Sequence, residues 1–277
     1  MDVIIQGIEI ETSDLRELAK LSGASRIERI TGQAFRLVGA CQQDNIPMYC
    51  LDARLDFAFV EQSVKLASFS LAAVDMDSTL VGIESIDEIA DMYGIKAQVA
   101  EITAKAMCGE VNFSEGLKRR VALLQGLDQS MLHRVYDEKL KLNPGAEKML
   151  KRMKTVGIRT MLISGGFTFF TDRLKERLGL DYAAANTLEI VDGKLTGRLV
   201  GEIVGAQGKA EALKRVRNEL GLRRDQLIAI GDGANDLQMM AEAGVSIAYH
   251  AKPIVQKNAT YTINHVGLDG VINLFEG

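Results

Sequence analysis

The stretch "LAAVDMDSTL" at residues 71–80 is an apolar run that ends in two carboxylates, Asp75 and Asp77. A continuous apolar run of this length is typical of a strand buried on both faces of a parallel sheet. Side chains two positions apart point to the same side of an extended chain, so two like charges meet here. An acidic turn after a strand is the plain interpretation. A functional site, in which a cation or a shared proton relieves the repulsion, is the other.

Further apolar runs follow, and the first two come after segments with helical periodicity that end in Gly. These runs are "GIRTMLIS" (157–164), "DQLIAIGD" (225–232), "AGVSIAY" (243–249) and "ATYTINH" (259–265). Strands that alternate with helices predict an α/β fold with a doubly wound, Rossmann-like parallel sheet and right-handed crossovers. The pair Asp192-Gly193 lies between two β-like runs and predicts a type I′ hairpin attached to this sheet.

A helical stretch at residues 84–142 separates the first two core strands. Glycines divide it into several amphipathic helices, and it is too long for a simple crossover. Open α/β sheets bind ligands outside the carboxyl ends of their strands, so we expect this insertion to cover that edge as a helical cap. The catalytic core then consists of residues 71–83 and 143–277.

Residues 1–70 form a separate small α+β domain in this interpretation. Its predicted strands are "VIIQGIEI", "QAFRLVGA" and "YCLDARLDFAFV", and its predicted helix is "SDLRELAKLSGA". Asp14 and Glu17 in that helix are spaced like a capping box. The domain carries no recognisable chemistry. A structural or dimer-forming role is therefore favoured over ligand sensing.

Composition excludes several classes of function. A net charge of -4 over 277 residues offers no basic stripe for nucleic acid. Three widely spaced cysteines (Cys41, Cys50, Cys108) form no zinc-ligand pattern, so we expect free thiols in a reducing compartment. No apolar stretch reaches the roughly 20 residues that cross a bilayer, and the N-terminus lacks a basic n-region. We expect a cytoplasmic protein with no membrane or nucleic-acid partner.

Polar side chains follow the predicted core strands in chain order, and we expect them to face one crevice. They are Asp75, Asp77 and Thr79 after the first strand, Ser164 after the second, Lys209 at the start of a helix, and Asp232, Asn235 and Asp236 after the third long strand. Several carboxylates cannot share a crevice as bare anions. Oxygen ligands without His or Cys select Mg²⁺, and the glycines of "SGGF" allow close approach of a phosphate to the backbone.

Each of these residues also has a simpler explanation. Ser164 could cap the helix that begins near Phe167, and Asp236 could be an acid favoured in a first helical turn. A solvated surface position is the alternative for Lys209, but a lysine in the first turn of a helix opposes the macrodipole. The functional interpretation is favoured because all of these residues occur together at successive strand ends.

The motifs resemble those of the haloacid dehalogenase superfamily of phosphatases. "DMDSTL" is similar to the DxDx[TV] signature, and "SGGF", Lys209 and "GDGAND" match the second, third and fourth motifs in order. The stretches "DMDSTLVGIESIDEIADMYG" and "KAMCGEVNFSEGLKRRV" resemble the bacterial branch of the superfamily that acts on phosphoserine. The resemblance covers about residues 70–275 and leaves the N-terminal domain outside it.

The resemblance implies a role for each residue of the crevice. Asp75 would be the nucleophile that forms an aspartyl-phosphate, and Asp77 would be the acid and then the base. Mg²⁺ would be bound by Asp75, by the main-chain carbonyl of Asp77 and by Asp232, with Asp236 supporting these ligands. The residues that would hold the phosphoryl group are Ser164, Gly165 and Lys209, with Asn235 close to it.

The resemblance also assigns selectivity to the cap. Glu84 would bind the substrate ammonium and Arg120 its carboxylate, since a guanidinium pairs with both carboxylate oxygens. Without the resemblance, Glu84 would be read as a helix N-terminal acid and Arg120 as part of a solvated "KRR" face. Met107 and Phe113 would line the apolar part of the cap.

The implied function is Mg²⁺-dependent hydrolysis of O-phospho-L-serine to L-serine and phosphate, the last step of serine biosynthesis. One alternative keeps the chemistry and passes the phosphoryl group to another small alcohol such as homoserine. Another is a non-catalytic amino-acid sensor with an inert core. The sequence leaves open whether the protein is a monomer or a homodimer.

Overall fold

The computed structural model describes residues 1–108 and 110–276, except for the side chain of Met107. Within these residues the largest sheet has the strand order β11-β10-β9-β5-β6-β7-β8. Its strands are β5 (Leu71–Asp75), β6 (Arg159–Phe167), β7 (Tyr182–Val191), β8 (Lys194–Val200), β9 (Leu227–Gly231), β10 (Val245–Tyr249) and β11 (Tyr261–Ile263). All neighbouring pairs are parallel except β7 and β8. The predicted α/β fold is confirmed.

Helices cover both faces of this sheet, which explains why its central strands are continuously apolar. On β5, Ala72 and Val74 join one apolar cluster while Leu71 and Ala73 join the other. The first face is covered by α7 (Ala146–Thr155), α8 (Thr168–Leu178) and α12 (Gly270–Asn273). The second is covered by α9 (Ala206–Glu219), α10 (Leu237–Met240) and α11 (Pro253–Asn258). Short 3₁₀ helices occur at η1 (Leu66–Ser68), η3 (Arg224–Gln226) and η4 (Ala234–Asp236).

The predicted hairpin joins β7 to β8. Asp192 and Gly193 have φ values of 51° and 74°, as a type I′ turn requires at both central positions. Strand β7 pairs in parallel with β6 before it enters the hairpin, so it belongs to the core sheet as well. This pairing was missed in the sequence, where only the hairpin half of β7 has a clear strand pattern.

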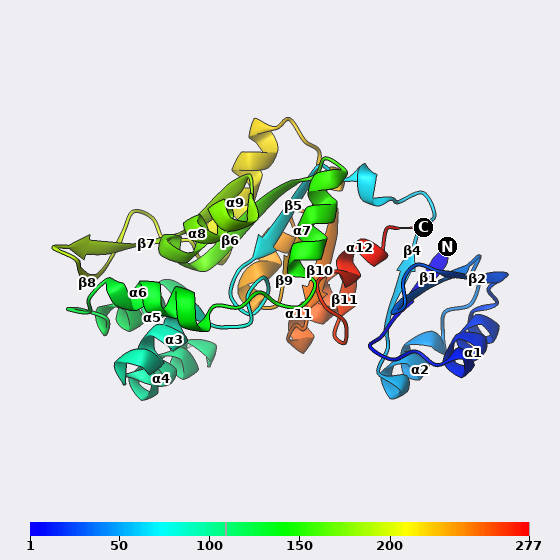
Figure 1. The fold of residues 1–277 in the computed structure, drawn as a ribbon, viewed down its shortest axis with the longest axis horizontal. Helices are drawn as coiled ribbons and strands as arrows, with labels where there is room; N and C mark the ends of the chain where they lie inside the picture. Colours follow the sequence, from blue (N-terminus) through cyan, green and yellow to red (C-terminus); the bar gives the residue numbers. More distant parts are fainter. Residues whose placement is uncertain (109, 277) are drawn as a thin grey trace.

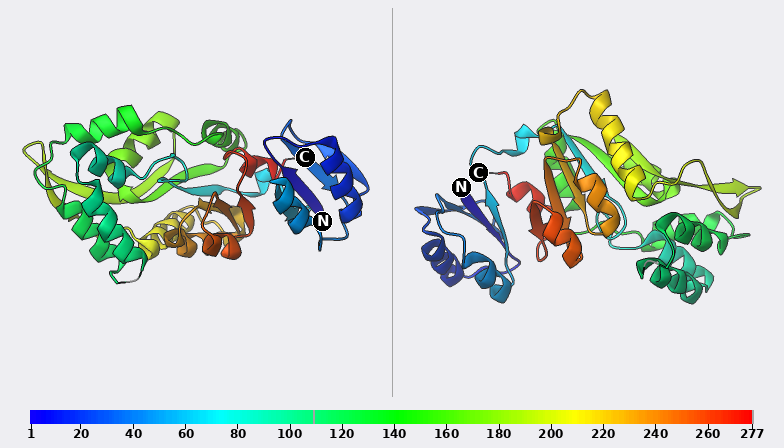
Figure 2. Two further views of the ribbon diagram at one scale, coloured as in Figure 1. Left: turned by 90° about the horizontal axis from the view of Figure 1, so that it is seen from below. Right: turned by 180° about the vertical axis from the view of Figure 1, so that it is seen from behind.

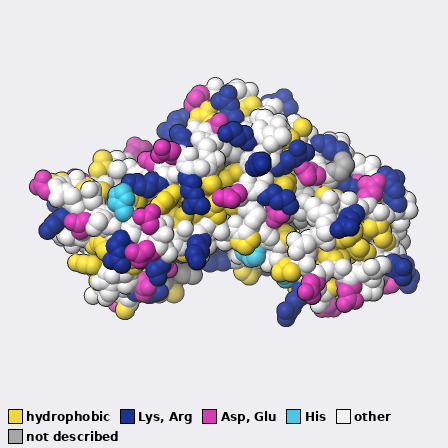
Figure 3. Space-filling view, in the orientation of Figure 1, with side chains coloured by type: hydrophobic (Ala, Val, Ile, Leu, Met, Phe, Trp, Pro, Cys, Tyr) yellow, Lys and Arg dark blue, Asp and Glu magenta, His cyan; other side chains and the backbone are white. Residues whose placement is uncertain are grey.

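The helical stretch after β5 forms α3 (Ser85–Tyr93), α4 (Lys96–Met107), α5 (Phe113–Ala122) and α6 (Ser130–Arg134), followed by a π-helical turn, η2 (Val135–Lys139). Figures 1 and 2 show these helices at one end of the elongated molecule and the N-terminal strands at the other. On the face shown in Figure 3, Lys and Arg side chains are interspersed with Asp and Glu. Among the described residues no helix has the length and apolarity needed to cross a membrane.

The N-terminal residues form an antiparallel sheet with the strand order β2-β3-β1-β4. Its elements are β1 (Asp2–Gln6), α1 (Thr12–Ser22), β2 (Arg26–Arg29), β3 (Ala34–Val38), α2 (Ile46–Ala53) and β4 (Asp56–Val60). Helices α1 and α2 pack on one face through a small cluster of their own. From the other face, Ile4 and Val60 join the apolar cluster that contains Val271 and Phe275 near the C-terminus. The two sheets therefore share part of one core.

Two details of the N-terminal prediction were wrong. The segment "YCLDARLDFAFV" is a strand only at Asp56–Val60, because its first residues complete α2. Pro47 lies in the first turn of that helix, and Leu51 is 75% exposed, as expected for a helix with one buried side. The capping box at α1 pairs Glu11 with Asp14, so Asp14 is the third helical residue and not the cap.

Candidate active site

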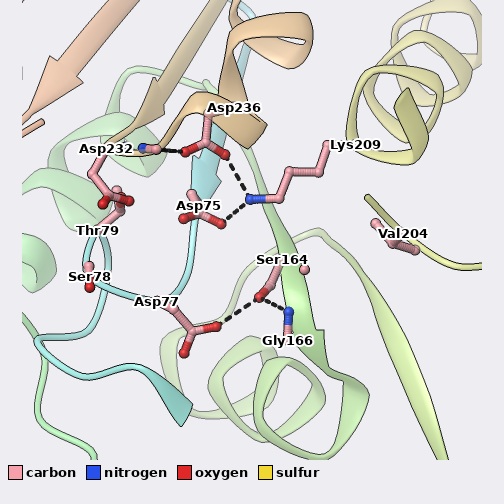
Figure 4. A network of polar contacts seen from close by, with 12 residues as sticks. Asp75, Asp77, Ser78, Thr79, Ser164, Gly166, Val204, Lys209, Asp232 and Asp236 are labelled. Carbon is pink, nitrogen blue, oxygen red and sulfur yellow. Dashed lines mark hydrogen bonds and ion pairs between the residues drawn. The ribbon is translucent and has the colours of Figure 1, made fainter. Parts of the chain in front are cut away.

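The turn after β5 places Asp75 and Asp77 at the carboxyl edge of the central sheet. Met76 between them points the opposite way and is fully buried. The chain then turns through Ser78, whose φ of 58° lies in the left-handed region, and the Leu80 N–H donates to the Asp75 carbonyl at 3.1 Å. Alternation along an extended chain thus puts both carboxylates on the site side (Figure 4).

Lys209 forms the floor of the site. It lies on α9 and is fully buried, and its ammonium contacts the carboxylates of Asp75 and Asp236, the latter at 2.7 Å. Burial works against the charged lysine, but the charges of Asp236 and Asp75 outweigh it and raise the pKa of Lys209. The alternative of a solvated surface lysine was wrong. Burial and the neighbouring Asp236 raise the pKa of Asp75, and the ammonium of Lys209 acts in the opposite direction.

Asp236 joins this floor to the loop after β9. Its second carboxylate oxygen accepts the N–H groups of Asp232 at 3.2 Å and Gly233 at 3.0 Å. The hydroxyl of Thr79 donates to Asp232 at 3.0 Å, which connects the loops after β5 and β9. Burial raises the pKa of Asp232 to about 6, with a further contribution from the charge of Asp236.

Three carboxylates converge in a way that suits a divalent cation. Asp75, Asp232 and Asp236 each offer an oxygen within 4.8 Å of the others. A set of hard oxygen donors favours Mg²⁺, Ca²⁺ or Mn²⁺ over softer metals. Both carboxylate oxygens of Asp236 are already engaged, Oδ1 by Lys209 and Oδ2 by two backbone N–H groups, whereas Lys209 contacts only Oδ1 of Asp75. Asp75 and Asp232 are therefore better placed than Asp236 to offer an oxygen to a cation.

Asp77 has an environment of its own, away from Lys209. Its carboxylate accepts the N–H of Ser85 at 2.8 Å and the hydroxyl of Ser164 at 3.2 Å. Burial raises the pKa of Asp77 to about 7, and the negative charge of Glu84 adds to the effect. A carboxyl group with a pKa near neutrality suits a residue that gives and takes a proton.

The loop after β6 is shaped by glycine and by a buried amide. Ser164 does not cap α8, since its hydroxyl accepts the Gly166 N–H at 2.8 Å. A Cβ on Gly166 would lie 2.7 Å from the Asp77 carboxylate, so a larger residue here would displace that carboxylate. Asn186 on β7 donates to the Gly165 carbonyl at 2.9 Å and accepts the Val204 N–H at 2.8 Å. Sequence reasoning missed Asn186, whose only signal is an amide within a strand.

A cavity of about 440 Å³ opens between the cap and the strand ends. Core residues Asp75, Asp77, Gly165, Asp232 and Asn235 line one side, and cap residues Glu84, Phe113 and Arg120 line the other. Residues 84–120 thus contribute side chains to a cavity at the carboxyl edge of the sheet. Ser164, Lys209 and Asp236 are buried beneath this cavity. Sequence reasoning missed other lining residues, among them Asp87, Thr103 and Lys252. The Met107 side chain lies outside the described residues.

The two polar cap residues are less enclosed than the floor. Glu84 is exposed and accepts the Ser78 hydroxyl at 2.7 Å. Arg120 is half-buried, and its Nε donates to the Gly116 carbonyl at 3.3 Å. Burial lowers the pKa of Arg120, while the charges of Asp87 and Glu84 act in the opposite direction. A guanidinium and a carboxylate thus face the cavity above the acidic floor.

Residues 72–241 match the family model for haloacid dehalogenase-like hydrolases. The chain belongs to this family. It is a hydrolase of the haloacid dehalogenase type, and the resemblance drawn from its four motifs is confirmed. Residues 3–46 match a second model, which is described only as a domain of unknown function (DUF4072).

Several curated relatives share most of the chain. A phosphoserine phosphatase from Polaromonas sp. is 50% identical over 216 residues, which cover 76% of this chain and 92% of that protein. A phosphoserine phosphatase from Vibrio cholerae is 44% identical over 218 residues, which cover 79% of this chain and 66% of that protein.

Solved structures extend the likeness to the N-terminal strands. A HAD family hydrolase from Salmonella enterica serovar Typhi has a TM-score of 0.90 and 32% identity, over 99% of this chain and 98% of that one. A probable phosphoserine phosphatase from Vibrio cholerae, in its unliganded form, has a TM-score of 0.87 and 36% identity, over 99% of this chain and 86% of that one.

Proposed function

We propose that this hydrolase is a Mg²⁺-dependent phosphoserine phosphatase that releases L-serine and phosphate from O-phospho-L-serine. The observation that carries the proposal is one cavity in which a carboxylate and a guanidinium on the cap face the acidic floor of the core. Relatives named as phosphoserine phosphatases, at up to 50% identity, support the choice of substrate. In the cell such an activity would complete serine biosynthesis in the cytoplasm.

Asp75 is the proposed nucleophile. Its carboxylate oxygen attacks phosphorus, the bond from phosphorus to the serine oxygen breaks, and an aspartyl-phosphate forms. Water then attacks the phosphorus of that intermediate, which releases phosphate and restores the carboxylate. A solved phosphoserine phosphatase described as a phospho-aspartyl intermediate analogue is 38% identical, with a TM-score of 0.70 over 75% of this chain and 99% of that one.

Asp77 is the proposed acid and base. In the first step it gives a proton to the departing serine oxygen, and in the second it takes a proton from the attacking water. Its pKa of about 7 allows both roles near neutral pH. The bonds from Ser85 and Ser164 hold the carboxylate toward the cavity.

Mg²⁺ would be held by the carboxylates of Asp75 and Asp232 and by the main-chain carbonyl of Asp77, with Asp236 behind them. The ion would offset the negative charge of the nucleophile and of the substrate phosphate. The phosphoryl oxygens would be bound by Lys209, by the Ser164 hydroxyl and by the backbone at Gly165, with Asn235 beside them.

The cap would select serine phosphate among phosphate esters. Glu84 would bind the substrate ammonium, and Arg120 would bind its carboxylate through two parallel hydrogen bonds. Both residues line the cavity, which supports these roles. Phe113 lines the same cavity and would pack on the short carbon chain.

The proposal is tested by phosphate release from O-phospho-L-serine and from a panel of other phosphomonoesters, with Mg²⁺ and with a chelator. We expect preference for phosphoserine and loss of activity in the chelator. Activity on the panel without activity on phosphoserine would refute the substrate while leaving the phosphatase chemistry intact. Adding small alcohols distinguishes hydrolysis from phosphoryl transfer, because transfer yields a new ester in place of free phosphate.

A further inference from the structure

A buried carboxylate is one of the contacts between the N-terminal unit, residues 1–60, and the core. Asp56 at the start of β4 is only 4% exposed, and it accepts three backbone N–H groups of the segment that follows β11. The Asn264 N–H lies at 2.7 Å, the His265 N–H at 2.9 Å and the Val266 N–H at 3.2 Å. Figure 1 shows β4 beside β11 and far from the cap. The contact is therefore at the end of β11, the edge strand of the catalytic sheet.

The segment 264–266 is in turn bonded to the loop after β10. The His250 N–H donates to the Ile263 carbonyl at 2.7 Å, and its Nε2 lies 3.0 Å from the Val266 carbonyl oxygen. Gln256 bridges the same two segments, since its amide donates to the Ala251 carbonyl and to the Asn264 side chain. His250 has a φ of 45°, a left-handed conformation that its hydrogen bonds help to hold.

The loop after β10 ends at the catalytic floor. Two residues beyond His250, the Lys252 N–H donates to the Asp232 carbonyl at 3.2 Å, and Lys252 also lines the cavity. Asp232 is the carboxylate that would bind Mg²⁺ beside Asp75. Three hydrogen-bonded segments thus lead from Asp56 to the backbone of a metal ligand.

We propose that Asp56 is a positioning residue for the metal site. By fixing segment 264–266 it fixes the loop 250–252, and that loop holds the Asp232 backbone in place for Mg²⁺. This gives the N-terminal unit a part in catalysis although none of its residues lines the cavity among those that the structure describes. The catalytic part of the inference rests on the proposed function, whereas its effect on metal binding does not.

The test is Asp56→Asn, which keeps the size of the side chain but offers one acceptor oxygen to three N–H groups. We expect faster hydrogen exchange of the Lys252 amide in the metal-free protein. We also expect the dissociation constant for Mg²⁺, measured by calorimetry without substrate, to rise by about 2- to 30-fold, the range for coupling through contiguous contacts. With phosphoserine, the Mg²⁺ concentration needed for half-maximal rate should rise in parallel, and the rate at saturating Mg²⁺ should change little.

Arg36→Met is the matched control in the same unit. Arg36 pairs with Asp2 at 3.1 Å and donates to the Glu276 carbonyl, so it also joins the unit to the C-terminal segment. Among the described residues it forms no hydrogen bond with segment 264–266. We expect a lower unfolding midpoint with unchanged Lys252 exchange and unchanged Mg²⁺ affinity. Equal effects of the two variants would overturn the inference, because general loosening of the unit would then explain both.

His250→Asn tests the same link from the core side, where the N-terminal unit is untouched. Asparagine tolerates the left-handed conformation but cannot reach the Val266 carbonyl. Asp56→Asn and His250→Asn break the same series of hydrogen bonds between β4 and the metal site. The double variant should therefore weaken Mg²⁺ binding less than the sum of the two single effects. Additive effects, or wild-type affinity in both single variants, would refute the role of Asp56. Amide exchange at Lys252 and Mg²⁺ affinity test the role of Asp56 even if the protein hydrolyses a phosphate ester other than phosphoserine.

Discussion

The floor of the cavity, formed by Lys209, Asp75 and Asp236, is built differently from its cap wall, formed by Glu84 and Arg120. The floor charges are paired without substrate, since buried Lys209 contacts Asp75 and Asp236. The cap wall is open. Glu84 is exposed, and Arg120 makes no ion pair among the described residues, only a bond to a carbonyl of its own helix.

This difference assigns phosphoryl transfer to the floor and the choice of substrate to the cap wall. Charges held in place before the substrate arrives need no reorganisation during the reaction, which favours the transition state of phosphoryl transfer on any ester. Charges on the wall that form no ion pair among the described residues can bind a zwitterionic leaving group. Changes in the floor should therefore damage every substrate, and changes in the wall should damage phosphoserine alone.

The largest effect is expected from Asp75→Asn. Without a nucleophile no aspartyl-phosphate forms, so kcat should fall by about 10⁴-fold or more on every substrate. Phosphate release gives the rate, and rapid acid quenching with labelled phosphoserine detects the covalent intermediate. A phosphorylated intermediate that persists in the variant would show that another residue is the nucleophile.

Asp77→Asn should lower kcat on phosphoserine by about 10²- to 10⁴-fold, the usual contribution of an acid–base group. The acid must carry its proton to release serine, so the wild-type kcat/KM should fall as the pH rises through about 7. An aryl phosphate, whose leaving group needs no proton, should lose less in the variant. A wild-type profile that stays flat from pH 6 to 9 on phosphoserine would contradict the role of Asp77.

Lys209→Met should abolish activity and lower the free energy of unfolding by about 3–5 kcal/mol at pH 7, because two buried carboxylates lose their partner. The pKa of Asp75, which Lys209 holds down, then rises further, and the folded state binds more protons than the unfolded one. Stability should therefore be partly regained between pH 7 and pH 5. Urea unfolding at both pH values measures this.

Lys214→Met on the same helix is the control for Lys209. Its ammonium pairs with Glu242 at 2.9 Å but is about half exposed, with 49% of its side chain accessible. The change should cost less than about 1 kcal/mol and leave activity intact. Similar losses in both variants would mean that α9, rather than the buried charges, is sensitive to substitution.

Glu84→Gln should have the smallest effect, a loss of about 2- to 5-fold in kcat/KM for phosphoserine, because the carboxylate is exposed. 3-Phosphoglycerate, which carries a hydroxyl in place of the ammonium, should be hydrolysed no worse by the variant than by the wild type. Equal losses on both esters would make Glu84 a support of the loop through Ser78.

The sequence predicted the part of the site that follows the strands. Asp75, Ser164 and Asp232 each come after an apolar run, and parallel strands bring such positions to one edge of a sheet. It could not reveal Asn186 or Asp56, because their bonds connect residues distant in the chain and leave no local pattern. Helix α2 was mistaken for a strand because its apolar and aromatic residues favour both structures, and the signal of Pro47 was overlooked.

The most direct test of the division between floor and wall is Arg120→Ala on two substrates, O-phospho-L-serine and phosphoethanolamine, which lacks the carboxylate. A charge-assisted pair of hydrogen bonds is worth about 1.5–3 kcal/mol. We predict that kcat/KM for phosphoserine falls by about 10- to 150-fold, to the level of phosphoethanolamine, whose own value changes little. Equal losses on both substrates would show that Arg120 supports the cap and does not select the substrate.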